Sequence, residues 1–248
     1  MIKFFRKTRQ QLLTENKTGK YLKYAIGEIV LIVIGILIAL SINNWNEKRK
    51  QTLVEINILN GLKTDILKDT IDINKNIRDF KALIKNDSIL IEHLTNNRNK
   101  NSKIENLFLQ NFAYQESIII LHHSHFDEAK LKGLSLIKKT TLRDSISRLY
   151  EFRYKILEQT ENSVKMFKVY NELISDKMSS AFLVNDKGVF SINDNFYNEL
   201  LHDDNFTYLL IMHQSLTKEK LYIIYNPILK SALEVVDAID IELEKLKE

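Results

Sequence analysis

Three histidines within four positions, His122, His123 and His125, are the densest group of side chains that could do chemistry in this 248-residue chain. On a helix, His122 and His125 would share a face, and Asp127 or Glu128 could add an oxygen ligand for a metal ion such as zinc. The spacing matches no recognised zinc motif, and such residues at a helix end more often cap the helix and hydrogen-bond. We therefore expect a structural role for the histidines, and no bound metal or cofactor.

Other catalytic patterns are weak or missing in the sequence. Glu199 and His202 form one Glu-x-x-His pair, but a di-iron bundle needs a second such pair and two further glutamates. The chain has no Cys, no Gly-rich phosphate loop and no Gly-x-Ser-x-Gly elbow. Two acidic pairs, 127–128 and 203–204, lie where helices are expected to begin, which favours capping and dipole roles. We predict that the chain is not an enzyme.

The elements that carry these residues are expected to be helices. The chain has 6 Gly and 1 Pro, so few positions would force a helix to end. Apolar side chains and one Thr recur at steps of three and four over residues 66–94, a seam that needs a partner helix, as in a coiled coil or bundle. The seam consists of Ile66, Thr70, Ile73, Ile77, Phe80, Ile84, Ile91 and Leu94.

The second half of the chain is expected to add further helices. Residues 95–105 predict a loop, and helices are expected over residues 107–122 and 127–138, the latter broken near Gly133. A long helix over residues 141–178 is expected to begin with Thr141 as its N-cap. Its core stripe is Leu142, Ile146, Leu149, Ile156 and Val164.

Residues 183–207 predict an irregular connector with two short β-like triplets and one short helix after Phe196. Asp203 and Asp204 could cap the next helix, and a last helix over residues 217–247 is expected to be interrupted or kinked at Pro227. The fold class predicted by these patterns is all-α, a spanning helix that continues into an elongated extracytoplasmic bundle.

The stretch Ala25–Ile42 is apolar except for Glu28, and is long enough to cross a bilayer. Tyr21 and Tyr24 precede it and Trp45 follows it, so aromatic residues frame the stretch at the spacing of the two membrane interfaces. A cleaved signal peptide is the nearest alternative, because small residues near position 39 loosely resemble a cleavage site. We predict a transmembrane helix over residues 25–45.

Orientation follows from the basic residues on each side of this helix. Residues 1–24 contain seven Lys and Arg residues, and three follow closely after the helix, at positions 48–50. The N-terminus is therefore expected in the cytoplasm and residues 46–248 outside it, at the inner (cytoplasmic) membrane. The basic residues of the 1–24 tail interleave with apolar ones, which favours contact with membrane lipid over nucleic acid.

Glu28, Gly35 and Ala39 lie on one stripe of the spanning helix. Glu28 and Gly35 are seven residues apart, and Ala39 is one turn beyond Gly35. Small residues allow close helix packing in lipid, so the stripe could join two spanning helices. The alternative is that Glu28 extends to the cytoplasmic interface beside the basic residues.

Three sequence segments carry a resemblance. ENKTGKYLKYAIGEI and GILIALSINNWNE, within the first 50 residues, resemble the start of a family of uncharacterised bacterial single-pass membrane proteins, described as a domain of unknown function. FDEAKLKGLSLIKKTTLRDSI at residues 126–146 is similar to the family more weakly. The resemblance implies the same membrane layout and no particular activity.

These patterns favour a membrane-anchored interaction or scaffold protein of the cell envelope, which would bind another envelope protein or a second copy of itself. A sensor that binds a small ligand between helices and acts through a partner is a second hypothesis. A metal-dependent enzyme that uses the histidine cluster is the third.

Overall fold

Helix α2 runs from Thr18 to Asn96, 79 residues without a break. The computed structural model describes residues 18–96, 101–113, 119–163, 182–184 and 190–247. Two compact units make up the chain, Met1–Glu55 and Ile56–Glu248. Most of the described residues are helical, which confirms the predicted all-α class.

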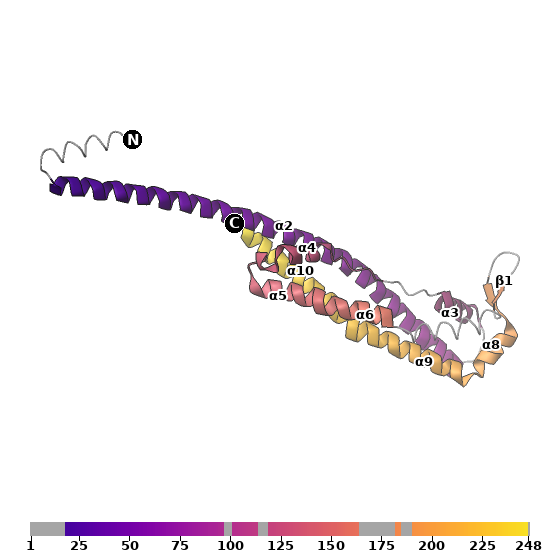
Figure 1. The fold of residues 1–248 in the computed structure, drawn as a ribbon. Helices are drawn as coiled ribbons and strands as arrows, with labels where there is room; N and C mark the ends of the chain where they lie inside the picture. The colour runs from indigo at the N-terminus through magenta and orange to yellow at the C-terminus, as the bar shows by residue number, and fades with distance from the viewer. Residues whose placement is uncertain (1–17, 97–100, 114–118, 164–181, 185–189, 248) are drawn as a thin grey trace. The chain divides into compact units, whose positions relative to one another are not determined.

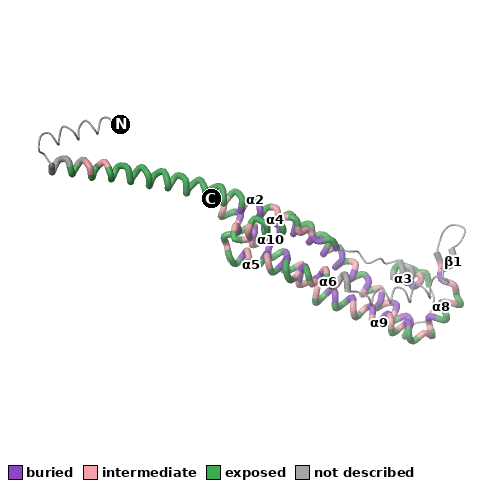
Figure 2. Tube along the Cα trace, in the orientation of Figure 1, coloured by how far each residue is buried: buried purple, intermediate pink, exposed green. Residues whose placement is uncertain are grey.

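The first unit contains the apolar part of α2. This is one helix long and apolar enough to cross a membrane, and every residue from 29 to 50 is exposed (Figure 2). Such full exposure of apolar side chains is unlike a core helix of a water-soluble domain. Residues 1–17 of the predicted basic tail, and the side chains of Tyr21 and Tyr24, lie outside the part that the structure describes.

In the second unit, α2 contributes a wide buried face. Of the predicted seam, Ile84 and Ile91 are only partly buried, whereas Leu83 and Leu90 lie in the core. The other members of the predicted seam are fully buried. The buried stripe is wider than a coiled-coil seam because α2 packs against several helices, as in a bundle.

Helix α3 spans Ser102–Ala113 and begins inside the predicted loop. The side chain of Asn101 accepts a hydrogen bond from the Ile104 amide (3.0 Å) and thereby caps this helix. Residues 119–123 are not helical, so the helix predicted to reach position 122 is wrong in this part.

Helix α4 spans Ser124–Lys132 and is followed by the 3₁₀ turn η1, Leu134–Leu136. The predicted break near Gly133 is confirmed, because Gly133 has a φ of 99°, a conformation that glycine adopts without strain. The predicted continuation as a helix to residue 138 is wrong.

A second long helix is built from α5, Thr140–Arg148, the π-helical turn η2, Leu149–Tyr154, and α6, Lys155–Ser163. Thr141 is not its N-cap, because the helix already begins at residue 140 and Lys139 occupies the cap position. Val164 of the predicted core stripe lies outside the described residues.

The predicted β-like triplets form a two-stranded antiparallel pair, β1 (Phe182–Val184) and β2 (Phe190–Ile192). Helix α8, Asp194–Leu201, starts before the predicted position 196 because the Asn193 side chain accepts a hydrogen bond from the amide of residue 195.

Helix α9 spans Asp204–Glu219, and the Asp203 side chain caps it by accepting from the amide of residue 206, as predicted. The last helix therefore begins before the predicted residue 217. It continues through the π turn η3, Lys220–Tyr225, into α10, Asn226–Lys247. Pro227 is the second residue of α10, two positions after η3 ends; its ring and missing N–H disturb the preceding helical turn, so the predicted interruption is placed at η3.

Two apolar cores hold the second unit together. The larger core joins α2 to α4, α5, η2, α6, η3 and α10, which run alongside one another in Figure 1. The smaller core joins the last turns of α2 to α3, β2, α8 and α9.

Candidate functional site

Two carboxylates of α2, Asp65 and Asp69, lie in the larger core. They are one helical turn apart, and their side chains are 2% and 0% exposed. Ionised carboxylates are rarely buried this deeply without a partner. Both meet the segment that contains the histidine cluster.

Asp65 caps helix α4 from the neighbouring helix α2. Its Oδ2 accepts from the His125 Nδ1 (2.7 Å), the His125 amide (3.2 Å) and the Ser124 hydroxyl (3.2 Å). Burial alone would raise the pKa of Asp65, but these hydrogen bonds and the charge of His125 outweigh burial and lower it. Asp65 therefore supplies the cap that the His123 side chain, at the N-cap position of α4, does not provide.

Asp69 holds His122 in the same manner. Its Oδ1 accepts from the His122 Nδ1 (2.7 Å) and from the His122 amide (3.0 Å). Here burial is the larger effect and raises the pKa of Asp69, although the hydrogen bonds from His122 oppose it.

Tyr150 and Tyr154 enclose this cluster from the π turn η2. Among the described residues, neither hydroxyl has a hydrogen-bond partner of normal geometry, nor has Asp69 Oδ2, although Tyr154 lies close enough to interact with that carboxylate. Burial, followed by the nearby carboxylates, raises the pKa of both phenols. Both tyrosines therefore stay protonated and can act only as donors to the carboxylates.

The lack of a side chain at Gly61 makes room for the His125 ring beside α2. A Cβ at position 61 would overlap that ring, with Cγ 2.7 Å and Nε2 2.8 Å away. Glycine lowers helix propensity, but here it leaves room for the Cδ2–Nε2 edge of the imidazole beside α2. Because the Nε2 edge of His125 faces α2, this nitrogen is poorly placed to bind a metal ion.

The predicted histidine cluster is thus divided among separate carboxylates. His123 contacts Glu158 of α6 (3.0 Å), whereas His122 and His125 bind the two α2 aspartates. In the described part of the chain, no three His, Asp or Glu side chains converge to hold a metal ion.

Asp127 and Glu128, the predicted additional oxygen ligands, are exposed and do not join a metal-binding group in the described residues. Glu128 instead pairs with Lys132 one turn later on α4, and this pairing lowers its pKa.

A third acid–histidine pair lies further along α2. Asp87 Oδ2 bonds His213 Nδ1 of α9 at 2.7 Å, with both side chains almost inaccessible to solvent. One and a half turns beyond Asp87, His93 bonds the Tyr197 hydroxyl of α8, and burial lowers the pKa of His93. The repeated pairs fix three different segments to one helix.

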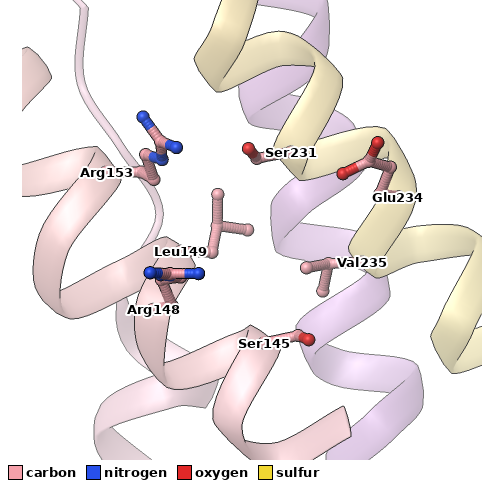
Figure 3. A pocket seen from close by; sticks show the side chains of 7 residues that line it. All are labelled: Ser145, Arg148, Leu149, Arg153, Ser231, Glu234 and Val235. Atoms are coloured by element: carbon pink, nitrogen blue, oxygen red, sulfur yellow. The ribbon is translucent and has the colours of Figure 1, made fainter. Parts of the chain in front are cut away.

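A partly open pocket of about 250 Å³ lies between the α5–η2 helix and α10 (Figure 3). Basic side chains of α5 and η2 form one wall, and α10 supplies a serine and a glutamate. The lining residues are Ser145, Arg148, Leu149, Arg153, Ser231, Glu234 and Val235. In the described chain this pocket lies apart from the histidine cluster.

Comparison with protein families gives one match. The model of the family of unknown function DUF6090 covers residues 28–201, which is more than half of the chain. The chain belongs to the DUF6090 family. No curated protein and no solved structure matched it. The family match includes the segments 35–47 and 126–146 of the resemblance, whereas the segment 15–29 lies almost entirely before it, and the family carries no assigned activity.

The membrane residues predicted for this DUF6090 chain lie on α2 within the first unit. Gly35 and Ala39 are exposed, and Glu28 is partly exposed. Trp45 is exposed as well, with the Arg49 guanidinium 6.0 Å from the centre of its ring. Association of two spanning helices through the stripe of residues 28, 35 and 39 therefore stays a prediction.

The sequence patterns did not identify Asp65 and Asp69 as site residues. Asp65 and Asp69 alternate with seam residues at Ile66 and Thr70, so acids occupy positions that the apolar period assigns to the buried face. Charged residues at such positions are a signal that a partner must exist. Tyr150 and Tyr154 could not be predicted from the regular helical period, because the π turn η2 places them on the buried side of the helix.

Proposed function

We propose that this DUF6090 protein is a membrane-anchored helical interaction module, or scaffold, of the bacterial cell envelope. One observation carries the proposal: a single helix supplies both an exposed, membrane-length apolar segment and the central core face of a bundle. A domain built on its own anchor is suited to hold a binding surface near a membrane. The anchor would contact lipid, and the bundle would bind an envelope protein or a second copy.

The proposed layout places residues 1–24 in the cytoplasm, residues 25–45 in the inner membrane and residues 46–248 in the periplasm or outside the cell. The excess of Lys and Arg before the apolar segment supports this orientation, because basic flanks tend to stay on the cytoplasmic side. Trp45 would lie at the outer interface, where its exposed ring suits the headgroup region.

A pair of reporters fused after Glu248 tests this layout. A phosphatase that is active only outside the cytoplasm should be active, and a fluorescent protein that folds only in the cytoplasm should stay dark. In a matched control, three of the tail's basic residues are replaced by Gln and three Lys are added after Trp45, which should shift the fusion towards the reverse orientation. Fluorescence from the unmodified fusion would overturn the proposed layout.

Crosslinking in living cells tests the binding role. The π turn η3 exposes Tyr222 and Ile223 (62% and 67%), an apolar pair at the surface of the bundle. A photoreactive residue at Tyr222 should give one defined product, either a dimer or a single heterologous adduct, whereas the same residue at exposed Lys230 should not. If both positions give nothing but diffuse products, the result counts against a specific partner.

A small-ligand sensor that acts through a partner is the second candidate. The pocket between the α5–η2 helix and α10 favours it, because ligand sites in helical bundles lie between helices. A metal-dependent enzyme has less support, since the described histidines engage different carboxylates.

A further inference from the structure

The pocket in Figure 3 has two chemically different walls. Arg148 and Arg153 of the α5–η2 helix lie on one side, and Ser231 and Glu234 of α10 lie on the other, while Ser145 is on the same helix as Arg148. The buried side chain of Leu149 and that of Val235 give the pocket apolar surface between these walls.

The π turn η2 brings the two arginines together. In an α-helix, positions five residues apart point about 140° away from each other, so Arg148 and Arg153 could not line one pocket. A π turn closes i→i+5 hydrogen bonds and returns the fifth residue to nearly the same face. Such turns are frequent at functional sites, and here the turn places the guanidinium groups of Arg148 and Arg153 at the same pocket.

The charges of the arginines are not neutralised locally. Within the described part of the chain, no carboxylate forms an ion pair with Arg148 or Arg153, whereas Lys130 of α4 and Glu151 of η2 pair with each other. Guanidinium groups are the side chains best shaped to hold a carboxylate by paired hydrogen bonds.

Two further lining residues, Ser145 of α5 and Glu234 of α10, can accept hydrogen bonds. Ser145 donates its hydroxyl proton to the Thr141 carbonyl (2.9 Å), so its oxygen presents lone pairs to other groups. Glu234 has only a loose contact with exposed Lys230 (3.9 Å), which solvent screens strongly. A ligand with only negative charge would be repelled by Glu234, whereas an ammonium group would be attracted.

We propose that this pocket binds a small zwitterion with an apolar body, of the kind of a neutral amino acid. The carboxylate would lie at Arg148 and Arg153, the ammonium group at Glu234 and Ser145, and the side chain over Leu149 and Val235. The volume of about 250 Å³ leaves room for a ligand of this size. The inference does not depend on the proposed membrane layout or partner.

Calorimetric titration of the purified full-length chain in detergent tests the proposal. L-leucine should bind saturably, and its two half-molecules, 4-methylpentanoate without the ammonium group and isoamylamine without the carboxylate, should bind at least about tenfold more weakly. Arg148→Gln or Arg153→Gln should weaken leucine binding about tenfold or more, and Glu234→Gln should reduce leucine affinity to that of 4-methylpentanoate.

Arg143→Gln is the matched control, because Arg143 lies on the same α5 helix outside the pocket and its loss changes the net charge equally. This variant should bind leucine as the parent does. The proposal is overturned if leucine does not bind, if all three Arg variants behave alike, or if O-phosphoethanolamine binds more tightly than leucine and so points to a lipid headgroup.

Discussion

At Asp65 and Asp69, burial and hydrogen bonding act in opposite directions on the charge. Hydrogen bonds prevail at Asp65 and lower its pKa, and burial prevails at Asp69 and raises its pKa. Buried pairs of this kind contribute little net stability compared with an apolar core, but removing one partner is costly. Their geometric effect is to fix the His122–His125 segment in one position on α2.

Gly61→Ala tests how tightly this segment is held. The new Cβ would overlap the His125 ring, so the ring must leave Asp65 or α4 must move. We expect a loss of about 1–3 kcal/mol in the free energy of unfolding, despite a gain of about 1 kcal/mol in helix propensity. Denaturant unfolding of the full-length chain measures this loss.

Gly27→Ala serves as the control, because nothing in the described structure lies within 4 Å of a Cβ at that position. It should not lower the stability. Adding His125→Ala to the Gly61→Ala chain should remove most of the Gly61→Ala penalty. A Gly61→Ala chain as stable as the parent would contradict the tight contact.

His93 makes the smaller core sensitive to pH. Burial lowers its pKa below the ordinary value of 6.5, so the unfolded chain binds a proton at this site more readily than the folded chain. The stability that His93 contributes is complete above about pH 6.5 and declines as the pH falls below it. His93→Gln, which can still bond Tyr197, should reduce the loss of stability between about pH 8 and about pH 5.

The measurement is the free energy of unfolding at several pH values for the parent and for His93→Gln. The rest of the chain is the same in both proteins, so the difference between the two curves reports His93. Parallel curves would show that His93 does not carry this effect.

At the scale of elements, the two π turns explain where the predicted periodicity fails. Along α5 the buried positions are Leu142, Ile146 and Leu149, and regular spacing would next bury positions near 153 and 156. Tyr150, Tyr154 and Leu157 are buried instead, one residue out of step, while Ile156 is only partly buried. A π turn contains one more residue than an α turn, so the predicted placement of Ile156 in the core stripe was wrong.

The spanning helix gives a prediction of its own. No side chain in the described structure requires a glycine at position 35, because a Cβ there would meet nothing within 4 Å. If the stripe of Glu28, Gly35 and Ala39 joins two chains, Gly35→Ile should weaken association of residues 20–50 in a membrane several-fold. Ile34→Leu, on another face, should not change it.

An in-membrane association assay of the parent segment and both variants measures this effect. If the parent does not associate, or both variants associate as the parent does, the stripe faces lipid and Glu28 extends to the interface.

At the scale of the whole molecule, the sequence predicted the class of fold better than the site. The all-α class, the apolar segment, the break at Gly133 and the cap at Asp203 follow from local signals within a few residues. The pairing of His125 with Asp65 joins positions 60 residues apart, and periodicity carries no information about such a distance.

The predicted helix boundaries were wrong where residues far away in the sequence determine the boundary. The start of α4 depends on Asp65 of α2, which acts as a cap from another helix, so the local sequence predicted a longer preceding helix. The start of α9 at Asp204, by contrast, has its cap in the adjacent residue Asp203, which local sequence predicts as a cap.

The two π turns, η2 and η3, also set how the chain tolerates changes in length. Removing one residue from a regular α turn rotates everything after it by about 100° and would turn the core face towards solvent. Removing exposed Glu151 or Tyr222 would instead convert a π turn into an α turn and leave the flanking faces in phase. These turns are therefore the positions in the two long helices where single-residue insertions and deletions can be absorbed without repacking the core.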